Sequence, residues 1–150
     1  MRLPPEVREQ FRAFGRAGGR ARAARLSATQ RRRIARKAAA TRWIRERFGA
    51  ASFAELGLPG GELVDVGLAA LADERTCRES LLVSLAAPRL QREGVPVGRV
   101  EESAEERLYE LLERDSARLA HARYLAYLQQ VVSFADACRT VRAQAASRAA

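Results

Sequence analysis

Residues 27–49 read SATQRRRIARKAAATRWIRERFG, and this stretch decides the fold class and the charge of the chain. Ser27 and Gln30 form the pattern of a capping box, in which a hydroxyl and an amide side chain satisfy two free backbone donors at a helix start. Gly49 suits the end of the same helix, since glycine readily adopts the left-handed conformation that closes many helices. The stretch therefore predicts a helix from Ser27 to Phe48.

The rest of the chain has the same helical character. Alanine, leucine, glutamate and arginine, which are strong helix formers, dominate the 150 residues, and no stretch alternates with the period of two that marks a strand. We predict an all-α protein, with a basic helical N-terminal arm followed by a small helical bundle. The few prolines are expected to separate helical segments, at Pro4, Pro5, Pro59, Pro88 and Pro96.

The bundle is predicted from apolar spacing and from further helix-start signals. Residues 62–71 are expected to form a short buried helix. Residues 76–79 are expected to form a capping box for a second helix, which Pro88 must kink or end. Residues 103–106 form the pattern of a third box, which begins a long helical stretch with a break near residues 115–116.

The chain upstream of Ser27 is expected to be less regular. A short helix that begins at the N-terminal prolines places Val7, Phe11 and Phe14 on one face. After it, three glycines are expected to loosen the chain into a flexible basic hinge, at Gly15, Gly18 and Gly19. In the helix after Ser27, Trp43 is expected on the side opposite an apolar stripe formed by Ile34, Ala38, Thr41, Ile44 and Phe48.

Positive charge is confined to the N-terminal third. Residues 1–49 hold fourteen arginines and Lys37 against three acids, a net charge of +12, whereas residues 50–150 have a net charge of −3. Concentrated positive charge binds polyanions through counterion release, and like charges at helical spacing repel each other unless an anion neutralises them. We therefore predict a nucleic-acid-binding arm at 1–49, with DNA as the first choice of ligand, and a partner-binding helical domain at 50–150.

The residues expected to contact nucleic acid combine phosphate-binding cations with one aromatic ring. Arginine and lysine bind phosphates, and a tryptophan among them is able to stack on a base. The alternative for the tryptophan is a docking residue that holds its helix on the rest of the protein. The predicted contacts are Arg20, Arg22, Arg25, Arg31, Arg32, Arg36, Lys37, Arg42 and Trp43.

No catalytic, cofactor or metal site is predicted. Cys77 and Cys138 lack metal-ligand spacing and fit apolar helical patterns as small buried side chains. Residues 15–20 are rich in glycine but lack the Lys-Ser/Thr ending of a phosphate loop. The N-terminus has no apolar run after its basic residues, and no stretch approaches the ~20 apolar residues of a membrane span. We therefore expect a cytoplasmic protein without membrane contact.

Residues 15–43 carry a recognisable motif. It consists of a basic Gly-Gly arm, Leu26-Ser27, and Ile-Ala-Arg-Lys-Ala-Ala at 34–39 followed by Arg42-Trp43, and it resembles a motif of small bacterial basic proteins. Three further segments are similar to uncharacterised proteins of nucleotidyltransferase-type toxin loci, at 81–90, 107–112 and 132–134. The resemblance implies a non-enzymatic antitoxin that binds operator DNA with one part and covers a cognate toxin, such as a nucleotidyltransferase, with the other. A homodimer is compatible with this implication.

Two alternatives stay open. Arg114 and His121 resemble the Arg-polar-x-His signature of HEPN ribonucleases, which are also all-α, and this resemblance implies that the two residues handle a scissile phosphate across a dimer. Because arginine is frequent throughout this chain, we favour a protein that is not an enzyme. In the other alternative, the basic arm docks into an acidic cleft of a protein partner.

Overall fold

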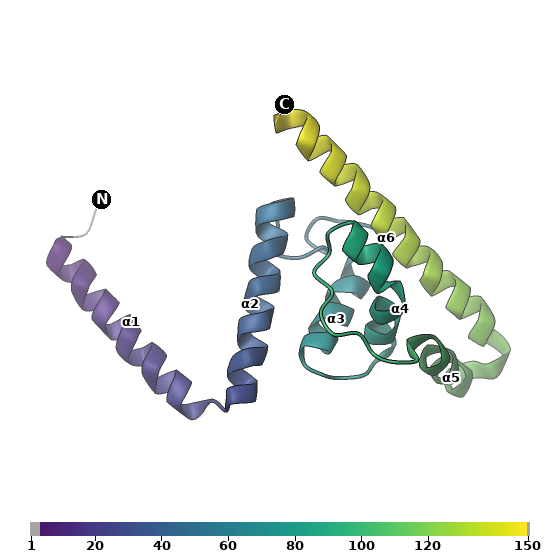
Figure 1. Ribbon diagram of the computed structural model, residues 1–150, viewed down its shortest axis with the longest axis horizontal. Helices are drawn as coiled ribbons and strands as arrows, with labels where there is room; N and C mark the ends of the chain where they lie inside the picture. The colour runs from purple at the N-terminus through teal and green to yellow at the C-terminus, as the bar shows by residue number, and fades with distance from the viewer. Residues whose placement is uncertain (1–3, 150) are drawn as a thin grey trace. The chain divides into compact units, whose positions relative to one another are not determined.

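The computed structural model describes the backbone of residues 4–149 and the side chains of residues 4–147. Its described part contains six α-helices, a short 3₁₀ helix and no strand, which confirms the all-α prediction (Figure 1). None of the described helices combines the length and the apolar content that a bilayer crossing requires. The chain divides into two compact units, residues 1–36 and residues 37–150.

The first unit contains α1 (Pro5–Arg25) and the first turns of α2 (Ala28–Phe48). Proline in the first turn and Glu6 near the positive end of the helix dipole both favour a start there. The expected hinge is wrong, because α1 continues through all three of its glycines, Gly15, Gly18 and Gly19. Strong helix formers surround them, and each glycine weakens a helix by about 1 kcal/mol relative to alanine without interrupting it.

The capping box that opens α2 is present as predicted. The backbone N–H of Gln30 donates to Ser27 Oγ at 3.1 Å, and the N–H of Ser27 donates to Gln30 Oε1 at 2.8 Å. Leu26 is extended and separates α1 from α2. At the other end, α2 stops at Phe48, and Gly49 follows with a φ of +79°, as the sequence indicates.

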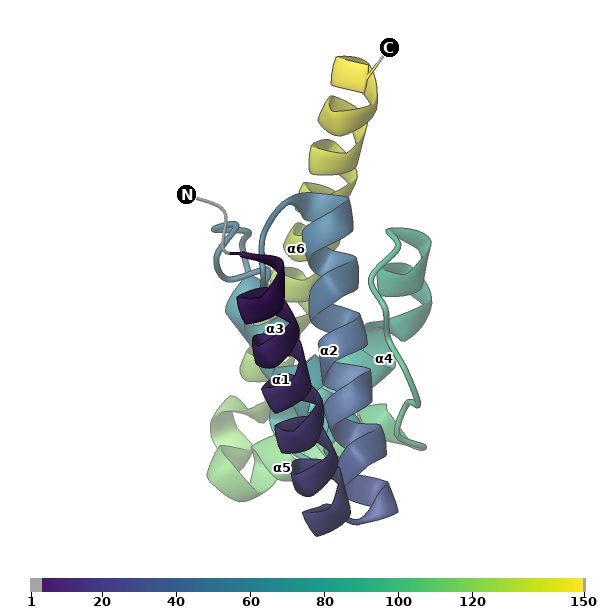
Figure 2. The same cartoon turned by 90° about the vertical axis from the view of Figure 1, so that its left-hand side faces the viewer.

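The second unit has one core, which is arranged around α4 (Arg78–Arg92). This helix packs against α3 (Gly61–Ala72), α5 (Ala104–Ser116) and α6 (Ala120–Ala149). The 3₁₀ turn Ala117–Leu119 joins α5 to α6 and confirms the predicted break. The last turns of α6 extend past α3, α4 and α5 in both views (Figure 1 and Figure 2). The largest fully buried side chains include Phe53, Val64, Leu81, Leu82, Leu90, Leu108, Leu112 and Phe134.

A chain of aromatic rings holds the end of α2 in this core. The ring centroids of Trp43 and Phe48 lie 5.7 Å apart. Those of Phe48 and Phe53 lie 5.4 Å apart, and those of Phe53 and Phe134 lie 5.0 Å apart. The last turns of α2 are thereby connected to the loop before α3 and to α6.

The apolar stripe predicted for α2 is partly wrong. Ile44 and Phe48 are buried as expected, but Ile34 is 42% exposed, and Trp43 packs against the core instead of lying opposite to it. An indole ring removes more apolar surface from water than an isoleucine or a threonine does. The helix is therefore rotated so that Trp43 shares its buried side.

Two predicted helix starts differ in detail. The N-cap of α4 is Cys77 and not Thr76, because the N–H of Cys77 donates to Ser80 Oγ at 2.9 Å. The hydroxyl of Thr76 donates instead to the carboxylate of Glu101 at 2.6 Å. Ser103 precedes α5 as expected but makes no capping hydrogen bond, since its φ of +49° differs from the extended backbone of an ordinary cap.

Pro88 does not end α4, which continues to Arg92. A proline inside a helix costs about 3 kcal/mol. Leu90, two residues further on, is fully buried, and burial of a leucine contributes about 1.5–3 kcal/mol. Ala87 is buried as well, so packing on both sides of the proline offsets the lost hydrogen bond.

The two cysteines are free thiols that differ in accessibility. Cys138 is buried, and this burial raises the pKa of its thiol to about 12. Cys77 is only half-buried, at the start of α4. We expect a thiol reagent at about pH 8 to modify at most Cys77 in the folded protein, because the thiolate is the reactive form. Titration with Ellman's reagent before and after unfolding in urea measures this. Equal rates for both thiols in the folded protein would contradict the burial of Cys138.

Glycine-to-alanine substitutions are expected to act in opposite directions in the two units. In Gly67→Ala, the new Cβ would lie 2.5 Å from the carbonyl oxygen of Glu79 and from Val83 Cγ2, where α3 crosses α4. We expect a loss of about 1–3 kcal/mol in the free energy of urea unfolding, as for other overpacked sites. In Gly18→Ala, the Cβ meets open space, and we expect higher helicity in far-UV circular dichroism. Unchanged stability of Gly67→Ala would show that α3 and α4 do not approach each other this closely.

Candidate nucleic-acid interface

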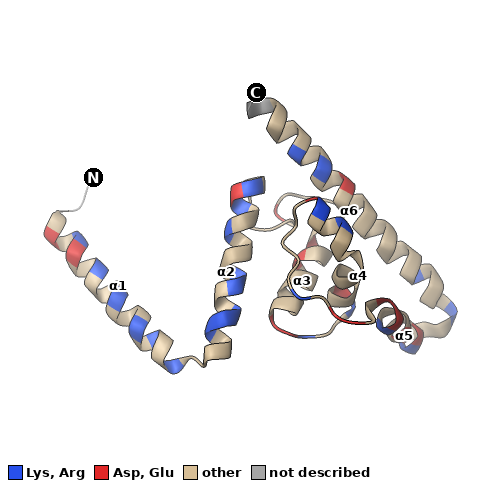
Figure 3. Ribbon diagram, viewed as in Figure 1, with Lys and Arg blue, Asp and Glu red and all other residues tan. Residues whose placement is uncertain are grey.

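The net charge of the whole chain resides in residues 1–36. These contain eleven arginines against two glutamates, a net charge of +9, whereas residues 37–150 contain sixteen basic and sixteen acidic residues. Basic residues far outnumber acidic ones along α1 and α2, whereas α4, α5 and α6 carry both signs in more similar numbers (Figure 3). The functional division that we expect after Gly49 stays a prediction.

α1 buries none of its side chains. Along it, four arginines follow one another at intervals of four residues and form one stripe, at Arg8, Arg12, Arg16 and Arg20. Like charges at this spacing repel each other and weaken the helix. Helices in water are marginally stable without a packed face, and the only acids of α1 are Glu6 and Glu9 at its start, so an anion along this stripe would remove a repulsion that the rest of α1 does not offset.

Two of the predicted contact residues are used inside the chain. Arg31 Nη1 donates to the carbonyl oxygens of Ala23 and Leu26, at 2.9 and 3.0 Å, and so satisfies carbonyl groups at the end of α1. Lys37 Nζ forms an ion pair with Asp73 Oδ2 at 2.9 Å. Both residues have structural roles that the sequence pattern did not indicate.

Five other members of the predicted set extend into solvent. These five are Arg20, Arg22, Arg25, Arg32 and Arg42. Their guanidinium groups form no ion pair with a carboxylate of residues 4–147. Arg36 is also exposed on α2. The charge of the five arginines is therefore free to meet an external anion.

Trp43 lies in the packing of the second unit. Besides its contact with Phe48, its ring lies 5.7 Å from the guanidinium carbon of Arg47. A Cβ added to Gly94 would lie 3.6 Å from the same ring. These contacts fit the alternative interpretation of Trp43 as a docking residue for α2.

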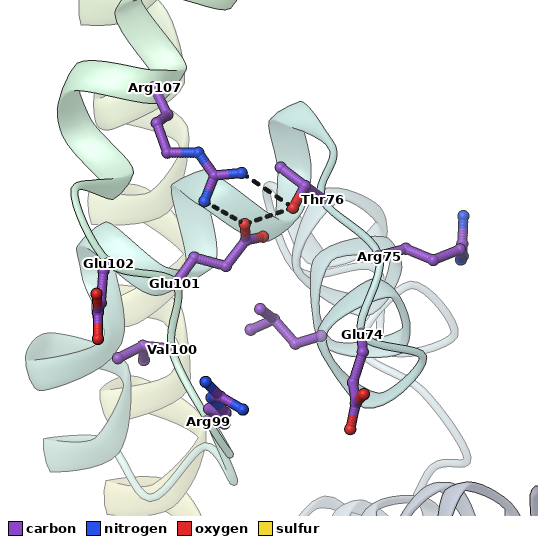
Figure 4. Close-up of a pocket in the computed structure, with 9 residues that line it drawn as sticks. Glu74, Arg75, Thr76, Arg99, Val100, Glu101, Glu102 and Arg107 are labelled. Atoms are coloured by element: carbon purple, nitrogen blue, oxygen red, sulfur yellow. Dashed lines mark hydrogen bonds and ion pairs between the residues drawn. The ribbon is translucent and has the colours of Figure 1, made fainter. Parts of the chain in front are cut away.

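A partly buried polar network on the second unit was not predicted. The carboxylate of Glu101 accepts hydrogen bonds from Thr76 Oγ1 at 2.6 Å, Ser80 Oγ at 2.5 Å and Arg107 Nη1 at 2.9 Å. The backbone N–H of Glu101 donates to Ser84 Oγ at 3.0 Å. Arg107 and Thr76 converge on Glu101 beside a cavity of about 340 Å³ (Figure 4). Because the carboxylate is already satisfied within the chain, we assign it a structural role that ties the segment before α5 to α4.

No sequence signal pointed to this network. Glu101 follows an extended connector and is followed by further glutamates, a pattern typical of a helix start. Thr76 and Ser80 lie 25 and 21 residues away from it in the chain. A pairing of this kind depends on tertiary structure, so local spacing does not reveal it.

The two residues of the ribonuclease alternative lie on different helices. Arg114, in α5, pairs with Glu110 at 3.7 Å. His121, in the first turn of α6, is exposed. Its ring centroid lies 6.5 Å from that of Tyr109. Across the described residues, no three His, Cys, Asp or Glu side chains gather into a set that could hold a metal ion.

Comparison with known proteins finds no relative. No family model matches the chain, no curated protein matches its sequence, and no solved structure matches its fold. The functional interpretation therefore depends on the charge, exposure and packing of the chain itself.

Glu101→Ala is expected to destabilise the second unit by about 1–2 kcal/mol, because it removes an acceptor from the buried hydroxyl of Ser80 and the carboxylate partner of the partly exposed Arg107. Urea unfolding followed by circular dichroism measures this loss. The exposed neighbour provides the control, and Glu102→Ala is expected to change stability by less than about 0.5 kcal/mol. Equal effects of the two substitutions would contradict the structural role of Glu101.

Proposed function

We propose that the protein binds nucleic acid, with DNA as the first choice, through its arginine-rich residues 1–49, and that residues 50–150 bind a protein partner without catalysing a reaction. An antitoxin combines these two activities. One observation carries the proposal: a net charge of +9 lies in residues 1–36, where α1 buries no side chain. Such a segment gains stability when phosphates replace the counterions that it holds in water.

The arginines that support the proposal most strongly lie in the last two turns of α1 and on the exposed side of α2. Arg20, Arg22 and Arg25 are all exposed and within six positions of each other. Guanidinium groups bind phosphate oxygens through two parallel hydrogen bonds, which gives arginine an advantage over lysine in this role. Arg31 and Lys37 contribute charge nearby, although their donors are engaged within the chain.

The protein-binding part of the proposal needs a surface outside the segments that resemble toxin-locus proteins. Most apolar residues of 81–90, 107–112 and 132–134 are buried, so these segments offer little apolar surface to a partner. Exposed apolar side chains lie instead around the junction of α5 and α6, where Leu119 is 45% exposed and Leu125 is 50% exposed. We propose this junction as the surface that a protein partner covers.

Removal of residues 1–49 would not be a clean test of the basic segment. Ile44 and Phe48 are buried in the core of the second unit, so that deletion would also remove part of the core. Substitutions in the full chain avoid this problem.

The triple variant Arg20→Gln, Arg22→Gln, Arg25→Gln is expected to bind a DNA duplex at least about tenfold more weakly at about 0.15 M salt. The slope of log affinity against log salt is expected to become shallower by about 2–3, because each lost phosphate contact removes about 0.9 of that slope. Fluorescence anisotropy with a labelled oligonucleotide over a series of salt concentrations measures both quantities.

A matched control removes the same charge from the neutral second unit. Arg99, Arg118 and Arg123 are exposed there, and their replacement by glutamine is expected to change the affinity by less than about twofold. Equal weakening by both triple variants would contradict a localised interface. Absence of binding by the wild type to both the duplex and a single strand of the same sequence would contradict the proposed function as a whole.

A further inference from the structure

α1 exposes two aromatic rings among its arginines. Phe11 is 66% exposed and Phe14 is 73% exposed. At 100° per residue, both rings and Val7 lie within about 60° of each other around the helix. Two phenylalanines held in water forgo the stabilisation that burial of such side chains gives. This face of α1 therefore has the character of a contact surface that no other described part of residues 1–36 buries.

The same face continues into a hollow near the end of the helix. The hollow has a volume of about 300 Å³ and is lined by Gly18, Ala21, Arg22, Arg25 and Leu26. By helical spacing, its two arginines lie on the side of α1 that carries the phenylalanines. A Cβ at Gly18 would meet open space, so no side chain interrupts the surface between the rings and the arginines.

This order of groups matches the chemistry of a single-stranded nucleic acid. Its bases present flat faces that stack on aromatic rings, and its phosphates bind guanidinium groups. In a duplex the base faces are covered by neighbouring base pairs, so the rings would remain in water. Phe11 and Phe14 therefore favour a single strand over a duplex.

An apolar groove of a protein fits this face less well. Arg22 and Arg25 lie on the same side of α1 as the two rings, and not only at the edges of that side. A protein groove that covered this side would therefore have to bury both guanidinium groups. A nucleic-acid strand, by contrast, presents apolar bases and charged phosphates side by side. The charge of residues 1–36 favours the same ligand.

We propose that α1 is a platform for single-stranded nucleic acid, on which Phe11 and Phe14 stack with bases and Arg22 and Arg25 bind the adjacent phosphates. This inference rests on the proposed function and names its substrate class. The sequence suggested a base-stacking role for Trp43, but the ring of Trp43 is packed in the second unit. The platform assigns this role to the two exposed phenylalanines instead.

The test uses the full chain with Phe11→Leu and Phe14→Leu combined. Leucine keeps the helix and the apolar character but has no aromatic face. Anisotropy is measured with a labelled single strand of about 20 nucleotides, with the duplex of the same sequence, and with poly-glutamate as an acidic polypeptide.

The wild type is expected to prefer the single strand. The leucine variant is expected to lose about 5- to 100-fold in single-strand affinity while duplex affinity changes by less than about twofold. Phe11→Trp with Phe14→Trp is expected to retain single-strand binding.

Several outcomes overturn the platform. If the leucine variant binds the single strand as tightly as the wild type, the rings do not stack, although the proposed function stands. Equal losses for single strand and duplex would mean that the rings support the helix and not a base. A loss for poly-glutamate as large as that for the single strand would indicate a general acidic ligand. If the wild type binds neither nucleic acid, both the platform and the proposed function fail.

Discussion

Repulsion between the arginines of α1 is the constraint that sets this helix apart from the rest of the molecule. In a packed helix, burial of apolar side chains outweighs such repulsion, but α1 has no buried side chain. In the second unit, a buried carboxylate is paired with arginines. Glu93 accepts a hydrogen bond from Arg139 at 3.0 Å and lies 3.5 Å from Arg142. Residues 37–150 thus have no net charge, whereas residues 1–36 have a net charge of +9, and this difference makes the first unit the main part of the candidate interface.

Local signals of the sequence predicted the helices well. Ser27, Gln30 and Gly49 set the ends of α2 because caps depend on residues within one turn of each other. Helix-breaking residues were misleading signals where long-range packing, or strong helix formers next to them in the sequence, outweighed their effect. α4 passes Pro88 because Leu90 is buried beyond it, and α1 passes its glycines because nothing in their surroundings or their φ angles requires a break.

The candidate site was only partly predictable for the same reason. A count of arginines is a property of the sequence, so the basic segment was evident at once. Which cations are used within the chain depends on tertiary contacts: Lys37 meets Asp73, 36 residues away. The rotation of α2 that buries Trp43 likewise follows from the ring contacts with Phe48, and the exposure of Phe11 and Phe14 became apparent only with the structure.

Amide hydrogen exchange of α1, measured with and without a single-stranded oligonucleotide, tests the central claim most directly. We predict that the amides of α1 exchange much faster than those of α4 in the free protein, because α1 lacks a packed face, and that the oligonucleotide slows exchange in α1 selectively. Protection of α1 equal to that of α4 in the free protein, or no response to the oligonucleotide, would contradict the claim that this helix needs a polyanion.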